Sequence, residues 1–235
     1  MSDPHLAAAL DALERSAQEP ANFYQPFLAL LPVSGAAVST VGKLLGSETV
    51  SASDDLALRV DELQFDLGEG PCWDAMNQGR PVLMPDIRAS RGRWPAFSAA
   101  ILECEVASLF AFPLVVGPLK IGAVDLYSIG ATTLDTAQTE QAATMANAVG
   151  RHVLRRALDT VGGDFDDVGT AHSRRLIHQA TGMVLAQLRI PGDDARLVIQ
   201  GHAFAAGRPM MEVAQEIIDG KLEFTRRETG IEVSE

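Results

Sequence analysis

Three short amphipathic helices are predicted toward the end of the chain, between residues 172 and 222. Apolar residues recur there at the spacing of one helix face, in three runs separated by the breakers Ile190-Pro191-Gly192 and Gly207-Arg208-Pro209. Asp193 is expected to cap the second helix, and Pro209 is expected to open the third. Helices this short are marginal in isolation, so the pattern predicts that they pack into one bundle.

A set of small and apolar residues sharpens this prediction. The first run contains Ile177-x-Gln179-Ala180-x-Gly182-Met183, the second contains Ala195 and Ala203, and the third contains Val213-Ala214 before Ile217-Ile218. This pattern resembles the ANTAR domain. The resemblance implies an all-α three-helix bundle that binds RNA and prevents transcription termination by stabilising an antiterminator hairpin.

Arginine suits RNA contact because its guanidinium binds phosphate bidentately and stacks on unpaired bases. The residues that we predict to contact RNA are the basic side chains of this region, although a solvated helix surface is the alternative for most of them. They are Arg174, Arg175, Arg196, Arg208 and Lys221.

Residues 1–160 alternate helix and strand signals. Helices are expected at 4–18, 23–31, 54–63 and 134–160, and Asp54 is expected to cap the third of them. Strands are expected at 35–41, 48–52, 80–84, 107–116 and 120–128, the first two joined through 42–46 and the last two through a turn at Gly117-Pro118. An antiparallel sheet flanked by helices is an α+β architecture.

Short motifs in this region resemble a GAF domain of the kind fused to ANTAR modules in actinobacteria. They are Gly68-Glu69-Gly70-Pro71-Cys72, Trp94-Pro95-Ala96-Phe97, and two strand-like runs at 108–114 and 121–127. The resemblance implies a GAF-like sensor domain that responds to a small molecule or to redox state and that dimerises. It does not name a cofactor or a ligand.

Sensor pockets are mostly apolar with a few polar groups. The candidate ligand pocket therefore consists of aromatic side chains and one thiol, although each aromatic alone is more often a core residue. The residues are Trp94, Phe97, Phe110, Phe112, Tyr127 and Cys72. Cys72 is either a thiolate at a helix start or a buried packing residue, and the two glycines before it indicate a tight turn before a helix rather than a phosphate loop.

Charge and composition limit the function classes. The chain has a formal charge of −12, which argues against general nucleic-acid affinity. Residues 1–168 hold 11 basic and 22 acidic side chains, whereas residues 169–235 hold 8 and 9. No run of eighteen apolar residues and no basic leader is present, so the expected compartment is the cytoplasm. Two cysteines and five histidines without ligand spacing give no reason to expect a metal site.

These observations predict a GAF-like sensor domain at 1–160, a linker at 161–169, an ANTAR-like RNA-binding domain at 170–222 and a C-terminal tail at 223–235. The expected function is a signal-responsive RNA-binding regulator of transcription antitermination, not an enzyme. A homodimer is expected because the apolar stripe of the helix at 134–160 is longer than one sheet needs. The first alternative is a protein-interaction or sensor module without RNA binding. The second, which the sequence favours less, is a GAF-type redox enzyme.

Overall fold

The computed structural model contains two compact units, Met1–His172 and Ser173–Glu235. The structure describes residues 3–16, 19–41, 47–90, 92–161, 174–227 and 230–234. The predicted turn at 42–46 lies outside the described residues, as does the predicted linker at 161–169 beyond its first residue.

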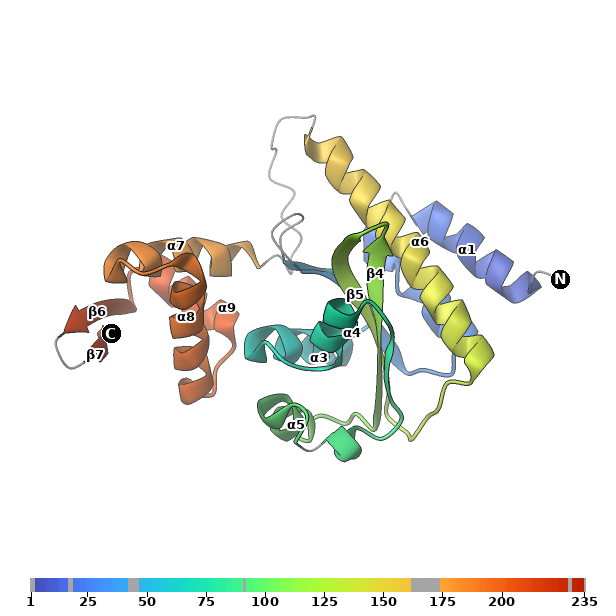
Figure 1. Cartoon of the computed structure of the whole chain (residues 1–235), viewed down its shortest axis with the longest axis horizontal. Helices are drawn as coiled ribbons and strands as arrows, with labels where there is room; N and C mark the ends of the chain where they lie inside the picture. The colour runs from blue at the N-terminus through green and yellow to red at the C-terminus, as the bar shows by residue number, and fades with distance from the viewer. Residues whose placement is uncertain are drawn as a thin grey trace. The chain divides into compact units, whose positions relative to one another are not determined.

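The first unit is built on a five-stranded antiparallel sheet (Figure 1). Its strands are β1 (Gly35–Thr40), β2 (Glu48–Ala52), β3 (Val82–Met84), β4 (Ser108–Val116) and β5 (Leu119–Ser128), in the spatial order β2-β1-β5-β4-β3. Strands β4 and β5 form the predicted hairpin, which turns at Gly117 with a positive φ of 58°. All five predicted strands are therefore confirmed, with ends that differ by one or two residues.

Helices cover both faces of this sheet, which confirms the α+β fold class (Figure 1). The helices α1 (Pro4–Ser16), α2 (Gln25–Leu30) and α6 (Thr136–Val161) pack on one face. The helices α3 (Asp55–Leu67), α4 (Pro71–Gln78) and α5 (Pro95–Ile101) pack on the other. Short 3-10 turns, η1 (Pro20–Asn22) and η2 (Ile87–Ser90), complete the unit. None of the described helices is long and apolar enough to cross a bilayer.

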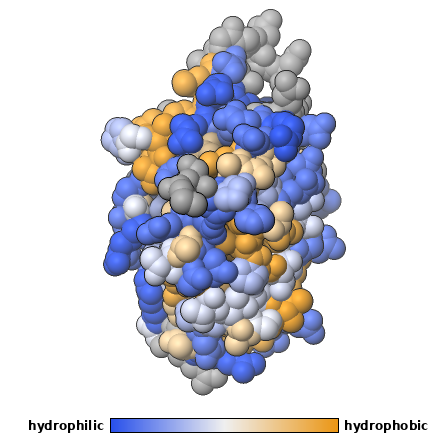
Figure 2. Space-filling model, turned by 90° about the vertical axis from the view of Figure 1, so that its right-hand side faces the viewer, coloured by the Kyte–Doolittle hydropathy of each residue, from blue (hydrophilic) through white to orange (hydrophobic). Residues whose placement is uncertain are grey.

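The long helix α6 uses its apolar stripe inside its own chain. Met145 and Val149 are fully buried in the core that α6 forms with the sheet and α1. The sheet and α1 of the same chain together cover this stripe, so its length beyond the sheet does not require a second copy. The face of the molecule at the right of Figure 1, where α1 and α6 lie, carries mostly hydrophilic residues with separate apolar patches (Figure 2).

The second unit begins with three helices, α7 (Arg175–Leu188), α8 (Gly192–Ala206) and α9 (Met210–Ile218). Their small and apolar residues, including Ala180, Ala195 and Ala203, are buried where the helices meet, as predicted. The predicted cap of α8 is wrong. Pro191 occupies the N-cap position and no side chain caps the helix, so Asp193 lies in the first turn, where its charge faces the positive end of the helix dipole.

Pro209 occupies the N-cap of α9 and not its first helical position, one residue from the prediction. The residues beyond α9, predicted only as a tail, form a hairpin of β6 (Glu223–Arg227) and β7 (Gly230–Ser234). Phe224 is 3 % exposed, its backbone N–H donates to Gln187 Oε1 at 3.2 Å, and its ring meets His202 edge to face at 5.7 Å. The hairpin is thus tied to the helical core, and His202 is a half-buried packing residue.

Candidate functional site

Polar side chains are buried on the face of the sheet that α3 and α4 cover. We refer to them as the sheet-face cluster; its members are Ser39, Asp61, Gln64, Cys72 and Asp125, each at most 3 % exposed. Ser39 and Asp125 come from the adjacent strands β1 and β5, Asp61 and Gln64 from α3, and Cys72 from the start of α4. Buried polar groups are costly unless they are paired, so their pairing decides what this cluster can do.

The Gln64 side chain joins three of the four elements of the cluster, α3, β5 and α4. Its Nε2 donates to Asp125 Oδ2 at 3.0 Å, and its Oε1 accepts from the backbone N–H of Cys72 at 2.7 Å. Gly70 makes room for it, because a Cβ at this position would lie 2.7 Å from Gln64 Oε1. Gly68 ends α3 in the left-handed conformation and Gly70 precedes α4, so the two glycines form the predicted turn.

Asp125 is the most perturbed group of the cluster. Burial raises the pKa of its carboxyl well above the ordinary value, and the nearby charge of Asp61 raises it further, while hydrogen bonds from Gln64 and Cys72 oppose the shift. Asp125 Oδ1 and Ser39 Oγ have no hydrogen-bond partner among the described residues. Each such orphan costs about 1–3 kcal/mol, so a small polar ligand that paired both atoms would recover that cost.

The six residues predicted for the pocket do not come together. Trp94, Phe97 and Tyr127 lie on the same face of the sheet as Cys72, with the Trp94 and Phe97 rings edge to face at 6.3 Å. Phe110 and Phe112 are buried in the opposite core, under α6. The prediction of one shared pocket is therefore wrong for these two, because their positions on β4 point to the other face of the sheet.

Tyr127 has a defined structural partner. Its hydroxyl donates to Asp54 Oδ1 at 2.8 Å, and burial together with this carboxylate raises the pKa of the phenol. Asp54 also caps α3 by accepting from the Ala57 N–H, as predicted from its position. Tyr127 thus ties β5 to the start of α3.

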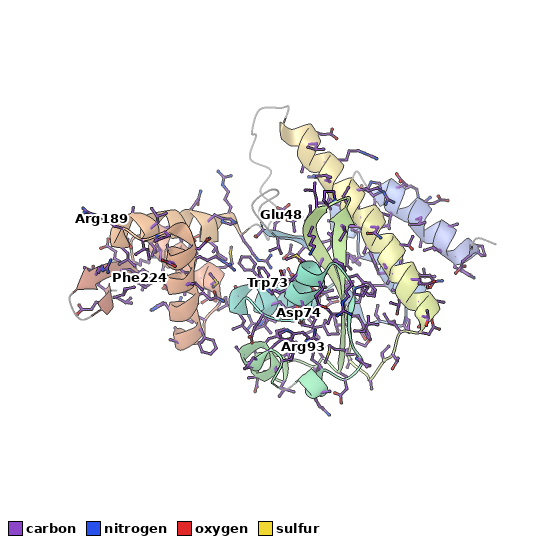
Figure 3. All side chains as sticks on the ribbon, viewed as in Figure 1. Glu48, Trp73, Asp74, Arg93, Arg189 and Phe224 are labelled. Carbon is purple, nitrogen blue, oxygen red and sulfur yellow. The ribbon has the colours of Figure 1, made fainter. Side chains whose placement is uncertain are left out.

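The sequence prediction missed Trp73, the residue after Cys72. Trp73 is half-buried, its Nε1 donates to the backbone oxygen of Gln64 at 2.6 Å, and it packs against the small apolar cluster of Cys72, Met76 and Ala123. Close by on α4, Asp74 pairs with Arg93 at 2.8 Å (Figure 3). The sequence feature that could have indicated Trp73 is its position next to Cys72 at a predicted helix start.

Neither cysteine has the setting of a reactive thiolate. Cys72 is buried and hydrogen-bonds to Asp125. Burial raises the pKa of the Cys104 thiol; Glu103 raises it further and Arg59 opposes the shift. Thiolate chemistry needs the opposite, a lowered pKa and partial exposure. Within the described ranges, no three His, Cys, Asp or Glu side chains gather as a metal ion would require.

In the second unit, two of the predicted RNA contacts carry their own counter-ions. Arg208 forms a bidentate pair with Glu216 at 2.8 and 2.9 Å, and Lys221 pairs with Asp219 at 2.9 Å. Arg174, just before α7, is 3 % exposed. These three side chains are therefore less available to phosphate than their sequence positions indicate.

The other two predicted contacts lie at the surface of α7 and α8. Arg175 is exposed in the first turn of α7, and Arg196 is half-buried on α8. Burial, and then the charge of Arg196, lower the pKa of His178 on α7. The prediction did not include Arg189, which is exposed at the end of α7 in the left-handed conformation, with φ of 54° (Figure 3). An arginine in this conformation is uncommon, and its position directly before the breaker Ile190-Pro191-Gly192 was the available signal.

Two family models match these two units. The GAF domain model matches residues 27–154, and the ANTAR domain model matches residues 169–218. The chain belongs to the GAF and ANTAR domain-containing regulators. The GAF match covers the sheet and most of the helices around it, and the ANTAR match covers α7, α8 and α9 but ends before the hairpin of β6 and β7.

Solved structures of other GAF-type domains are similar to the first unit. The GAF domain of a phosphoenolpyruvate-protein phosphotransferase from Acinetobacter has a TM-score of 0.52 and 10 % identity, over 71 % of this chain and all of that one. A free methionine-R-sulfoxide reductase from Neisseria meningitidis, in complex with its substrate, has a TM-score of 0.49 and 15 % identity, over 68 % of this chain and 95 % of that one. No curated protein matches the chain. The domain combination points to a regulator rather than an enzyme.

Proposed function

We propose that this chain is a signal-responsive, RNA-binding regulator of transcription antitermination that acts in the cytoplasm. The observation that carries the proposal is the three-helix bundle of α7, α8 and α9, which the ANTAR model matches. Cations at the surface of this bundle bind the phosphates of RNA hairpins, with the exposed Arg175 and the half-buried Arg196 as the first candidates.

The GAF domain supplies the signal. Its sheet-face cluster presents a carboxyl whose neutral form is favoured and an unpaired hydroxyl, Asp125 and Ser39. Both groups can donate and accept a hydrogen bond, so they suit a small, uncharged polar ligand. Trp94, Phe97 and Tyr127 contribute apolar surface to the same face of the sheet.

We further propose that two copies act together as a homodimer. Two linked RNA-binding modules raise affinity through effective concentration when both engage one RNA. The buried stripe of α6 is not available for this contact, so the interface must use outer surfaces. Light scattering tests this proposal, because a monomer has a mass of 25.0 kDa and only that species would be seen if the dimer did not form.

The RNA proposal is tested by sequencing RNA that co-purifies with the full chain. Enriched hairpins near terminators are expected. Salt titrations of the enriched RNA then compare an Arg175→Ala, Arg196→Ala double variant with Arg208→Ala. The double variant should reduce the salt slope by about 0.7–0.9 for each phosphate that is no longer neutralised. Arg208→Ala should change it less, because Glu216 and Glu212 already neutralise that guanidinium.

One observation favours an alternative function. Arg208 and Lys221 both pair with carboxylates of the same unit, which reduces the charge left for phosphate. A bundle of this kind also suits a protein partner. Absence of any enriched RNA, together with a protein that co-purifies in stoichiometric amount, would favour that alternative.

A further inference from the structure

One row of side chains on α8 combines three chemistries that nucleic-acid recognition uses. Arg196, Gln200 and Phe204 recur every four residues along the helix. Residues four apart are surface neighbours, about 5–6 Å between Cβ atoms, so a cation, an amide and an aromatic ring follow one another along α8. Arg208 comes four residues later, just beyond the helix end, held by Glu216.

Phe204 is unusual among the aromatic side chains. It is 64 % exposed, whereas every other Phe, Tyr or Trp in the described ranges is buried or half-buried. Besides Gln200 and Arg208, its neighbours on the helix surface are the exposed glycines Gly201 and Gly207. Nothing lies within 4 Å of where a Cβ at Gly201 or Gly207 would be. The two glycines therefore leave space beside the ring for a planar group.

The charge pattern favours RNA as the occupant. Residues 195–211 contain no Asp or Glu, although the whole chain carries a charge of −12. The carboxylates nearest to Arg208, Glu212 and Glu216, form ion pairs with it. The other large exposed apolar residue on α8, Leu197, is seven residues from Phe204, about 10 Å along the helix. A protein-docking patch is expected to be contiguous, but here a glycine separates the two side chains.

We infer that Phe204 is a base-stacking residue of the RNA site, on which an unpaired base of a hairpin loop lies. This inference rests on the proposed function of RNA binding. Arg196 contacts the phosphate next to that base, and the Gln200 amide contacts its edge. Aromatic side chains stack splayed loop bases in this way, and stacking tolerates different bases because each has a π-face.

The test uses the full chain and hairpin RNAs with a fixed GC stem and a randomised loop, enriched on the wild-type protein. Phe204→Leu retains apolar volume but removes the π-face, and it should lower affinity about 5- to 150-fold. The salt slope should not change, because the same phosphates stay neutralised. Phe204→Trp, which keeps an aromatic ring at this position, should bind the hairpins with about the affinity of the wild type. A 2-aminopurine in the loop should change fluorescence with the wild-type protein and not with Phe204→Leu.

Leu197→Ala is the matched control, because Leu197 is 62 % exposed on the same helix but carries no aromatic ring. It should bind the enriched hairpins as the wild type does. Wild-type affinity in Phe204→Leu, or equal losses of affinity in Phe204→Leu and Leu197→Ala, would overturn the stacking role while RNA binding itself stands. If the wild type enriched no hairpin, the proposed function would fail first. A shift from dimer to monomer in Phe204→Leu would identify the site as a protein interface instead.

Discussion

Replacing Asp125 with Asn should stabilise the GAF domain, and the gain should grow with pH. The pKa of Asp125 is raised in the folded state, chiefly by burial. The unfolded chain therefore loses this proton at a lower pH than the folded chain does, near 3.8. Between the two pKa values, each pH unit lowers the stability of the wild type by about 1.4 kcal/mol, the linkage slope for one proton. Asn does not titrate, so Asp125→Asn avoids this loss.

The substitution preserves the geometry of the site. The Asn carbonyl can accept the hydrogen bond from Gln64 Nε2 that Asp125 Oδ2 accepts at 3.0 Å, and the Asn amide stands in for the protonated oxygen. The assay is urea unfolding at several pH values from 4 to 8. Both tryptophans of the chain, Trp73 and Trp94, lie in the GAF domain, so their fluorescence reports the unfolding of this domain alone.

The quantity to plot is the stability of Asp125→Asn minus that of the wild type. It should rise by about 1.4 kcal/mol per pH unit from pH 4 upward and then level off at the folded pKa of Asp125. Asp11→Asn, on the exposed side of α1, makes the same charge change away from this cluster and serves as the control. A flat difference for Asp125→Asn would refute the reasoning, because Asp125 would then titrate alike in both states.

Three further predictions concern the helices. Ala203 is 2 % exposed in the bundle, so Ala203→Glu should unfold the bundle, at a cost of about 3 kcal/mol or more. The helical signal in circular dichroism should decrease while tryptophan fluorescence is unchanged. Ala205→Glu, at an exposed position of the same helix, should not have this effect. Arg189→Gly should raise the stability of the bundle by about 1 kcal/mol in thermal unfolding, because glycine adopts the left-handed conformation without strain. Burial lowers the pKa of His152, so the unfolded histidine gains its proton at a higher pH than the folded one. The free energy of unfolding should therefore fall as pH drops below about 6.5. His152→Gln should weaken this dependence when unfolding is measured at several pH values.

Elements with a strong local signal were predictable from the sequence. The five strands, the Asp54 cap and the three helices of the bundle each follow from hydrophobic period or from one residue type at a boundary. The start of α8 was predicted incorrectly because the sequence offers two N-cap residues, Pro191 and Asp193. In the structure Pro191 is the N-cap, and the helix begins before Asp193. The hairpin of β6 and β7 escaped prediction because its main anchor, Phe224, packs against α7 and α8.

The candidate sites were harder to predict than the fold, for two physical reasons. Aromatic residues in a strand look alike in sequence whichever face they occupy, so Phe110 and Phe112 could not be separated from Tyr127 without knowing the register. The sheet-face cluster draws on residues from four separate segments. Gln64 lies 61 residues from its partner Asp125, and no local pattern indicates such a pair.

The charges of the bundle constrain how an RNA site there could discriminate among RNAs. Non-specific affinity grows with the number of phosphates that cations neutralise. Here Arg208 and Lys221 are engaged with carboxylates, and residues 1–168 hold 22 acidic but only 11 basic side chains. Few phosphate contacts then remain to support binding to an arbitrary RNA. A specific hairpin must gain its advantage from interactions that do not depend on net charge, which are the shape of the stem and the stacking of loop bases. An exposed ring such as Phe204 supplies that kind of interaction, and it makes the affinity for the correct hairpin less sensitive to salt than that of a basic RNA-binding surface.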